Sequence, residues 1–201
     1  AAPMVAFPII LIAGQIWNGH PLWTNTLKEG GIPALMTMTI TLGMGLWVIT
    51  DYIRGVAHIE SYTVSHILSW ISFDVMTHTS NQWVILPNWE ISFGVWVDQT
   101  TLMLLFVATF LTFLICWFAI GYMTTDEINE NRNHRFFAEY LLFTAGMFGM
   151  VLADNFLWLF IFWEIMGLCS YLLIGFYYWK PSAASAAKKA FMTTRVGDVF
   201  L

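Results

Sequence analysis

The chain of 201 residues is 58% hydrophobic and only 10% charged, and its mean hydropathy is +0.67. A soluble domain carries about 25% charged residues, so this composition excludes an ordinary soluble protein and indicates a polytopic membrane protein. The net charge of −5 says little about partners, because charges on opposite sides of a membrane do not act together.

Six apolar segments follow one another along the chain. They cover residues 4–17, 32–50, 99–123, 136–153, 155–178 and 187 onward. We therefore predict an all-α polytopic membrane protein with about six transmembrane helices. The sixth segment stops without a terminating signal, so we expect that helix to be truncated and the chain to be a piece of a longer protein.

The long connection over residues 51–97 is too polar to span a membrane. It contains ILSWISF and EISFGVWV, which both alternate in polarity as strands do. We predict a small hairpin on the outer surface between the second and third helices. The spacing of His58, His66 and His78 in this connection matches no metal-ligand motif, and we interpret them as solvated loop residues.

The sequence contains no evident redox centre. Cys116 and Cys169 lie within apolar segments and form no CxxC or Cys/His pattern that could bind zinc or an iron–sulfur cluster. All five histidines lie in polar connections, whereas a membrane haem protein needs histidines within its helices. We therefore expect no metal or cofactor in this chain.

Basic residues divide unevenly between two sets of connections. One set comprises residues 18–31, 124–135 and 179–189. It holds six lysines and arginines, whereas the other set, residues 51–97 with the turn at Asp154, holds only Arg54. Because basic loops stay on the cytoplasmic side, the first set should face the cytoplasm or matrix and the amino terminus should lie outside.

Glu164 lies near the middle of the apolar run NFLWLFIFWEIMGLCSYLLIGFYY. A helix of that length spans about 36 Å, enough to cross a hydrocarbon core of roughly 30 Å. An acid at this depth costs on the order of 3 kcal/mol, and such residues are functional by default. We expect Gly167 and Ser170 to admit a neighbouring helix and turn Glu164 into a bundle. The alternative is a static ion pair that locks two helices.

The sixth segment carries Lys188, Lys189, Arg195 and Asp198. Arg195 and Asp198 are spaced to pair on one helix face. Lys188 shares that face, whereas Lys189 is rotated by about 100°. Alternatively, the lysines only snorkel at the interface and the Arg195–Asp198 pair only neutralises itself.

Three further acids have less specific interpretations. Asp98 and Asp154 begin the third and fifth segments, where we expect them to cap helix amino termini. Glu139 lies one turn into the fourth segment, and we interpret it as an interfacial side chain.

Residues 98–201 resemble a known family, most clearly in VLADNFLWLF, WEIMGLCSYLLIGF and KAFMTTRVGDVF. They are similar to the largest antiporter-like membrane subunit of respiratory complex I, which is related to Mrp-type sodium/proton antiporter subunits. The first 97 residues are similar only in character. The resemblance implies that residues 1–123 form three N-terminal helices, and that residues 124–201 begin the first of two inverted helical repeats.

The resemblance further implies a subunit that translocates protons, driven by quinone reduction elsewhere in the complex. It assigns the proton path to Glu164, Arg195 and Asp198, and it favours Lys189 over Lys188. The lysine that pairs with Glu164 is expected on a later helix outside this chain. FMN, iron–sulfur clusters and quinone are expected in partner subunits, with no redox chemistry in this chain.

Some alternatives stay open. The chain could belong to a stand-alone Mrp-like cation/proton antiporter or a related ion-uptake complex, or be a split or purely structural fragment. The expected partners are other membrane subunits of a complex I-type assembly and the lipid bilayer, without nucleic acid. A prokaryotic cell membrane is the expected location, with the mitochondrial inner membrane as the alternative.

Overall fold

The protein is a row of helices with a small β-hairpin at one end. The computed structural model describes residues 2–17, 20, 28–57, 81–86, 89–125 and 132–199. The helices are α1 (Ala2–Ile16), η2 (Lys28–Gly30), α2 (Gly31–Ala57), α4 (Gln99–Thr125), α5 (Asn133–Val151), α6 (Phe156–Ile174) and α7 (Pro181–Asp198). The strands are β1 (Asn81–Leu86) and β2 (Trp89–Phe93).

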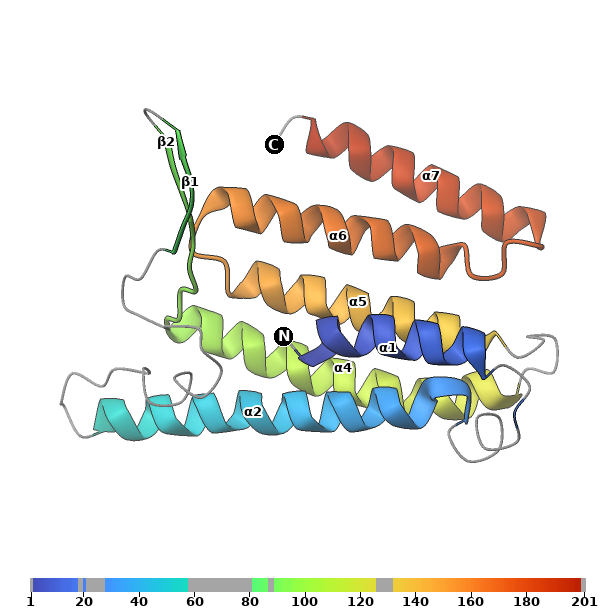
Figure 1. Cartoon of the computed structure of the whole chain (residues 1–201), viewed down its shortest axis with the longest axis horizontal. Helices are drawn as coiled ribbons and strands as arrows, with labels where there is room; N and C mark the ends of the chain where they lie inside the picture. Colours follow the sequence, from blue (N-terminus) through green and yellow to red (C-terminus); the bar gives the residue numbers. More distant parts are fainter. Residues whose placement is uncertain are drawn as a thin grey trace.

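The helices lie side by side in the order α7, α6, α5, α4 and α2 (Figure 1). Helix α1 packs against α5 and α2, on one side of this row. Consequently α2 and α7 lie at opposite edges of the described molecule. Consecutive helices α5, α6 and α7 are antiparallel, as short connections require.

Three described helices are long and apolar enough to cross a membrane, at Gly31–Arg54, Gln99–Met123 and Phe156–Ile174. This confirms the predicted class of polytopic helical membrane protein. Three boundaries differ from the prediction. Helix α2 continues to Ala57, seven residues beyond the expected end at residue 50, so the start of the predicted connection is helical. Helix α6 ends at Ile174, so its 19 residues span about 29 Å. Helix α7 begins at Pro181 instead of residue 187, because proline fits the first turn and the alanine-rich stretch after it favours helix.

Of the two acids that were expected to cap helices, Asp98 and Asp154, one does so. Asp98 caps α4, because the Thr101 backbone N–H donates to its Oδ1 at 2.6 Å. That hydrogen bond holds the pKa of the Asp98 carboxyl below its ordinary value. The prediction for Asp154 is wrong, since Asn155 is the N-cap of α6 and accepts the Trp158 N–H at 2.9 Å.

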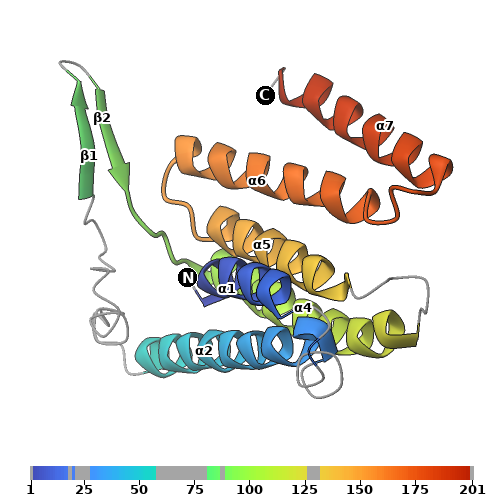
Figure 2. The ribbon, with the colours of Figure 1, turned by 45° about the vertical axis from the view of Figure 1, so that its right-hand side comes forward.

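The predicted hairpin is present between α2 and α4. Strands β1 and β2 pair antiparallel and project from the end of the helix row (Figure 2). Strand β2 overlaps the predicted EISFGVWV stretch, whereas its partner β1 was not predicted as a strand. The predicted ILSWISF strand lies outside the described residues. Just beyond β2, Val95 bridges to Ala153 and the Trp96 N–H donates to the Leu152 carbonyl at 3.1 Å. These contacts tie the hairpin to the α5–α6 turn.

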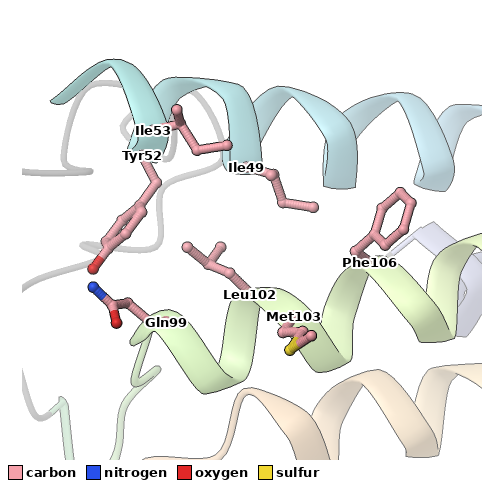
Figure 3. Close-up of a pocket in the computed structure, with 7 residues that line it drawn as sticks. All are labelled: Ile49, Tyr52, Ile53, Gln99, Leu102, Met103 and Phe106. Carbon is pink, nitrogen blue, oxygen red and sulfur yellow. The ribbon is translucent and has the colours of Figure 1, made fainter. Parts of the chain in front are cut away.

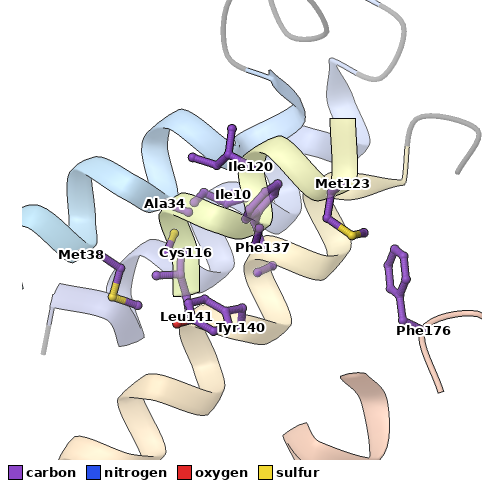
Figure 4. Packing of buried hydrophobic residues seen from close by; sticks show 12 residues of the cluster. Ile10, Ala34, Met38, Cys116, Ile120, Met123, Phe137, Tyr140, Leu141 and Phe176 are labelled. Atoms are coloured by element: carbon purple, nitrogen blue, oxygen red, sulfur yellow. The ribbon is translucent and has the colours of Figure 1, made fainter. Parts of the chain in front are cut away.

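The main apolar core lies where α1, α2, α4 and α5 meet (Figure 4). Its fully buried side chains include Met38, Cys116, Phe137 and Leu141. Tyr140 adds a polar contact, because its hydroxyl donates to the Thr112 carbonyl at 2.6 Å. This core makes α5 the central helix, on which α6 then packs.

Two glycines of α5 bring α5 and α6 together. A Cβ on Gly146 would be 3.4 Å from the Ile165 side chain of α6, and a Cβ on Gly149 would overlap the ring of Phe162. The predicted close approach at Gly167 is wrong, since a Cβ there would meet open space. The small residues that matter for α6 are therefore on its neighbour.

A pair of matched substitutions tests this packing. Gly149→Ala and Gly167→Ala both replace a helical glycine, so they gain helix propensity equally. We expect Gly149→Ala to lower the thermal unfolding midpoint relative to Gly167→Ala, because only the first forces the Phe162 ring to move. Equal midpoints for the two purified proteins in detergent would show that Gly149 is not needed for the α5–α6 contact.

A buried carboxylate holds the start of α5. Glu29 in η2 has a left-handed backbone, with φ of 51°. The Asn133 backbone N–H donates to its Oε2 at 3.1 Å, and the Asn133 side chain donates to the Met123 carbonyl at 3.2 Å. Burial raises the pKa of Glu29 above its ordinary value, although the Asn133 hydrogen bond opposes the shift.

Glu29→Gln should therefore change the pH dependence of stability. An acid whose pKa is raised on folding contributes fully at low pH, and that contribution is lost as pH rises through its folded pKa. Glutamine mimics the neutral acid at every pH. We expect the two proteins to unfold alike near about pH 4 and the variant to be the more stable near about pH 8. A wild-type advantage at the higher pH would contradict the direction of the shift.

Candidate functional site

The interface between α6 and α7 brings Glu164 and Arg195 together. Glu164 lies about 12 Å from the start of α6, close to the middle of that helix. Its Oε2 forms an ion pair with Nη1 of Arg195, and the same Nη1 is 3.8 Å from Oδ2 of Asp198. The side chains of Glu164 and Arg195 are 25% and 31% exposed, and that of Asp198 is 14% exposed. Three of the four predicted site residues therefore form one cluster.

Trp163 of α6 forms a hydrogen bond with Asp198, the second acid of this cluster. Its indole Nε1–H donates to Oδ1 of Asp198 at 3.0 Å, across the two helices. Sequence reasoning did not single out this tryptophan, because its hydrogen-bond partner lies on another helix. The hydrogen bond fixes Asp198 on the α6 side of α7.

Aromatic rings support the arginine. The guanidinium carbon of Arg195 lies 4.8 Å from the ring centroid of Phe191, one turn earlier on α7. The Phe191 ring in turn lies 5.2 Å from that of Tyr171 on α6. A cation over an aromatic face is attracted to it by about 0.5–2 kcal/mol. This stacking restricts where the Arg195 side chain can move.

One cation is thus shared between two acids. The cluster contains one guanidinium and two carboxylates, and a carboxylate is a group that can bind a proton. When Glu164 binds a proton, its attraction for Arg195 weakens and Asp198 can take over the guanidinium. The arrangement can therefore store and release a proton without any redox step.

The predicted lysines lie apart from this cluster. Lys188 and Lys189 are both exposed, and in the part of the chain that the structure describes neither forms an ion pair. Helix α7 is continuous through both residues, so Lys188 shares the Arg195 face by its seven-residue spacing. The role of Lys189 stays a prediction.

Glu139 is not the interfacial side chain that the sequence suggested. Its side chain is only 6% exposed, and its Oε1 accepts from Arg135 Nε at 2.7 Å. Its Oε2 is buried and has no hydrogen-bond partner among the described residues. The sequence places Glu139 on α5 but does not show that neighbouring helices cover it.

Other candidate sites find less support. Within the described ranges, no group of three or more His, Cys, Asp or Glu side chains could hold a metal ion. His58, His66 and His78 lie outside those ranges. A cavity of about 430 Å³ lies between α2 and α4, near Tyr52, Gln99 and Phe106 (Figure 3). Its lining is largely apolar, and it is separated from the α6–α7 cluster by α4 and α5.

The helix row and its intramembrane ion pair define a polytopic membrane protein with an ionisable cluster between two helices. Residues 83–137 match the family model described as the N-terminus of chain 5 of NADH-ubiquinone oxidoreductase, or complex I. Residues 153–201 match the model of the transmembrane domain of NADH:quinone oxidoreductase and Mrp antiporters. The chain therefore belongs to this family of antiporter-like membrane subunits.

Individual relatives agree with the family. The chain is 52% identical over 103 residues to F(420)H(2) dehydrogenase subunit L of Methanosarcina mazei, which covers 51% of this chain. It is also 33% identical to the chloroplastic NAD(P)H-quinone oxidoreductase subunit 5 of Nephroselmis olivacea, in an alignment of 197 positions that covers 95% of this chain. The chain spans 15% of the first relative and 27% of the second.

A double-mutant cycle tests the α6–α7 pair. Arg195→Met alone leaves the Glu164 charge without its partner, whereas adding Glu164→Gln removes that charge. We expect the two substitutions to couple by about 1 kcal/mol or more in the free energy of unfolding in detergent, within the ~0.5–3 kcal/mol typical of contacting residues. As a control, Lys189→Met combined with Glu164→Gln should be additive. Additive effects in the first cycle would mean that the pair does not hold the helices together.

Proposed function

We propose that the chain is part of a proton-translocating membrane subunit of a complex I-type NADH:quinone oxidoreductase. The observation that supports this most is the ion pair between Glu164 and Arg195 inside the spanning region. An intramembrane acid with a partner on another helix can bind a proton or a cation, but not both at full strength. The chloroplastic relatives are named as subunits of NAD(P)H-quinone oxidoreductase, which points the same way.

In this mechanism Glu164 is the proton-binding group. When ionised it pairs with Arg195, and when protonated it releases Arg195 towards Asp198, which Trp163 holds in place. A lysine on a later helix of the complete subunit would compete for the ionised Glu164. Movement of either cation changes the affinity of Glu164 for a proton, which is what passing a proton requires. Lys189 would supply a further positive charge in the proton path, in the half of α7 that follows the α6–α7 turn.

The driving reaction is assigned to partner subunits. Quinone reduction there, with FMN and iron–sulfur clusters, would supply the energy for translocation. This chain would contribute charged side chains and helix contacts, and residues 124–201 would begin the first antiporter-like repeat. The other membrane subunits of the assembly and the lipid bilayer are the proposed surroundings.

We also propose an orientation in the membrane. The arginines and lysines of η2, the start of α5 and the α6–α7 turn lie at one end of the helix row. At this end Arg132 lies 5.8 Å from the Tyr178 ring centroid and Lys180 lies 4.9 Å from that of Tyr177, a pairing suited to a membrane interface. This end would face the cytoplasm of a prokaryotic cell, or the equivalent side of an organelle membrane, with the amino terminus outside.

A second candidate is a subunit of an Mrp-like cation/proton antiporter. The family model that matches residues 153–201 includes Mrp antiporters as well as quinone oxidoreductases. The two candidates differ in their energy source. Proton uptake driven by quinone reduction favours the first, and proton flux driven by an imposed sodium gradient favours the second.

The central test is Glu164→Gln in the complete complex. Glutamine keeps the size and one hydrogen-bonding oxygen but cannot ionise, so proton translocation into membrane vesicles should fall to a small fraction of wild type. Glu164→Asp keeps the carboxylate and should retain more translocation than Glu164→Gln. Undiminished translocation by a normally assembled Glu164→Gln complex would overturn the proposed function.

A further inference from the structure

Glu139 is a buried acid with one carboxylate oxygen that lacks a hydrogen-bond partner among the described residues, and the mechanism proposed for Glu164 gives it no role. It is an acid with 6% of its side chain exposed, in the second turn of α5. Only Oε1 has a partner, because Arg135 Nε is 2.7 Å away while Oε2 has none among the described residues. An ionised carboxylate can accept at two oxygens, so this pair leaves half of the group unsatisfied in a buried place.

The partner of Glu139 is only loosely held. Arg135 is 48% exposed, so water competes for its guanidinium, whereas the acid is covered. Both residues belong to α5, spaced four apart, and pairs at this spacing contribute only about 0.2–0.5 kcal/mol to the stability of a helix. A static pair that locked two helices would join different helices, as Glu164 and Arg195 do. The Arg135–Glu139 pair therefore does not serve that purpose.

The surroundings of Glu139 contain little other charge. The ionisable residues of α6 are Glu164, Cys169 and Tyr171, of which Cys169 is close enough to Glu139 for an electrostatic interaction. Helix α1, which also packs on α5, has no ionisable side chain. The other described elements packed on α5 carry further ionisable residues. Element η2 contains Lys28 and Glu29, of which Glu29 binds the Asn133 N–H. Helix α4 contains Cys116, which faces Tyr140, and the exposed Tyr122, and Asp51, Tyr52 and Arg54 lie at the hairpin end of α2. Arg135 alone favours the ionised form, and burial favours the neutral form.

We propose that Glu139 is a second proton-binding carboxylate, which exchanges protons with the aqueous side at the Arg135 end of the α5–α6 interface. When Arg135 is hydrated and away, Glu139 takes one proton from water and becomes a neutral acid. When Arg135 returns, the proton leaves to water or onward, and the carboxylate pairs with the guanidinium.

The position of Glu139 suits a proton-binding group that lies between the membrane surface and Glu164. Helices α5 and α6 are antiparallel, so the start of α5 lies beside the end of α6. Cys169, which neighbours Glu139, is five residues from Glu164, or about 7.5 Å along the helix axis. The inference rests on the proposed function for its place in a proton path. The binding of a proton by Glu139 does not depend on it.

The experiment measures proton binding directly. In infrared difference spectra of the purified complex, with ¹³C-labelled glutamate, lowering the pH should produce the carbonyl band of a protonated acid. We expect Glu139→Gln to lose one such band that Glu164→Gln and Glu29→Gln both keep. Arg135→Gln should shift the titration midpoint of this band to higher pH, because the cation that favours the ionised form is gone. A folded Glu139→Gln protein that loses no band, or an unmoved midpoint in Arg135→Gln, would overturn the proposal.

Translocation assays then separate the two proposals. Glu29→Gln is the matched control, because Glu29 is equally a buried acid at this end but binds the α5 amino terminus. We expect Glu139→Gln, and not Glu29→Gln, to lower the number of protons moved per quinone reduced. If Glu164→Gln abolishes translocation and Glu139→Gln leaves it unchanged, only the inference about Glu139 fails. If Glu164→Gln leaves it unchanged, the proposed function fails, whatever the infrared bands of Glu139 show.

Discussion

The ion pair between Glu164 and Arg195 is the interaction on which the arrangement of α6 and α7 depends. An acid inside a membrane helix costs on the order of 3 kcal/mol. Breaking a buried pair by removing one partner costs about 3–5 kcal/mol, because the remaining charge is left uncompensated. The side chains of Glu164 and Arg195 are a quarter to a third exposed in the described chain, so breaking their pair should cost less than breaking a fully buried one. Even so, α7 must present Arg195 to the middle of α6, and this fixes the relative depth of the two helices.

The scaffold behind the pair explains why α6 can hold this position. Helix α5 is buried against α1, α2 and α4 through Phe137 and Leu141, and its amino terminus is held by Glu29. Its glycines then let α6 approach until Phe162 and Ile165 lie against the α5 backbone. On the far face, Gly175 lets the end of α6 pass close to Ala187 of α7. Each contact sets the register of the next helix, so the charged cluster is positioned by apolar packing several helices away.

Hydropathy and spacing predicted most of the fold, because burial in lipid depends on composition alone. The segments, the hairpin and the Arg195–Asp198 pairing could all be read in this way. Capping was less predictable at neighbouring Asp154 and Asn155, since both residue types can cap and only the backbone angles decide between them. The open space at Gly167 could not be predicted, because it depends on which neighbour reaches which face.

Hydropathy and spacing also predicted part of the candidate site. Glu164 stands out in sequence because no other charge lies near it. Helical spacing paired Arg195 only with Asp198, and the resemblance placed the partner of Glu164 on a later helix, whereas Arg195 forms the ion pair in the described chain. Trp163 could not be assigned, since its hydrogen bond to Asp198 needs two helices to be placed first. Glu139 was misjudged because its distance from the helix start suggested an interface. Its burial depends on the helices that pack around α5, which the sequence does not place.

Glu164 and Glu139 differ in what can change their charge. The cation of Glu164 is on another helix and is shared with Asp198, so a small shift of α7 against α6 alters the electrostatic balance. The cation of Glu139 is on its own helix, so movement between helices leaves their spacing unchanged. Only the hydration and rotamer of Arg135 can alter that pair. A chain that contains both would couple one acid to helix displacement and the other to access of water. Directional proton transfer needs both kinds of control, because a site that changes affinity must also change the side to which it is open.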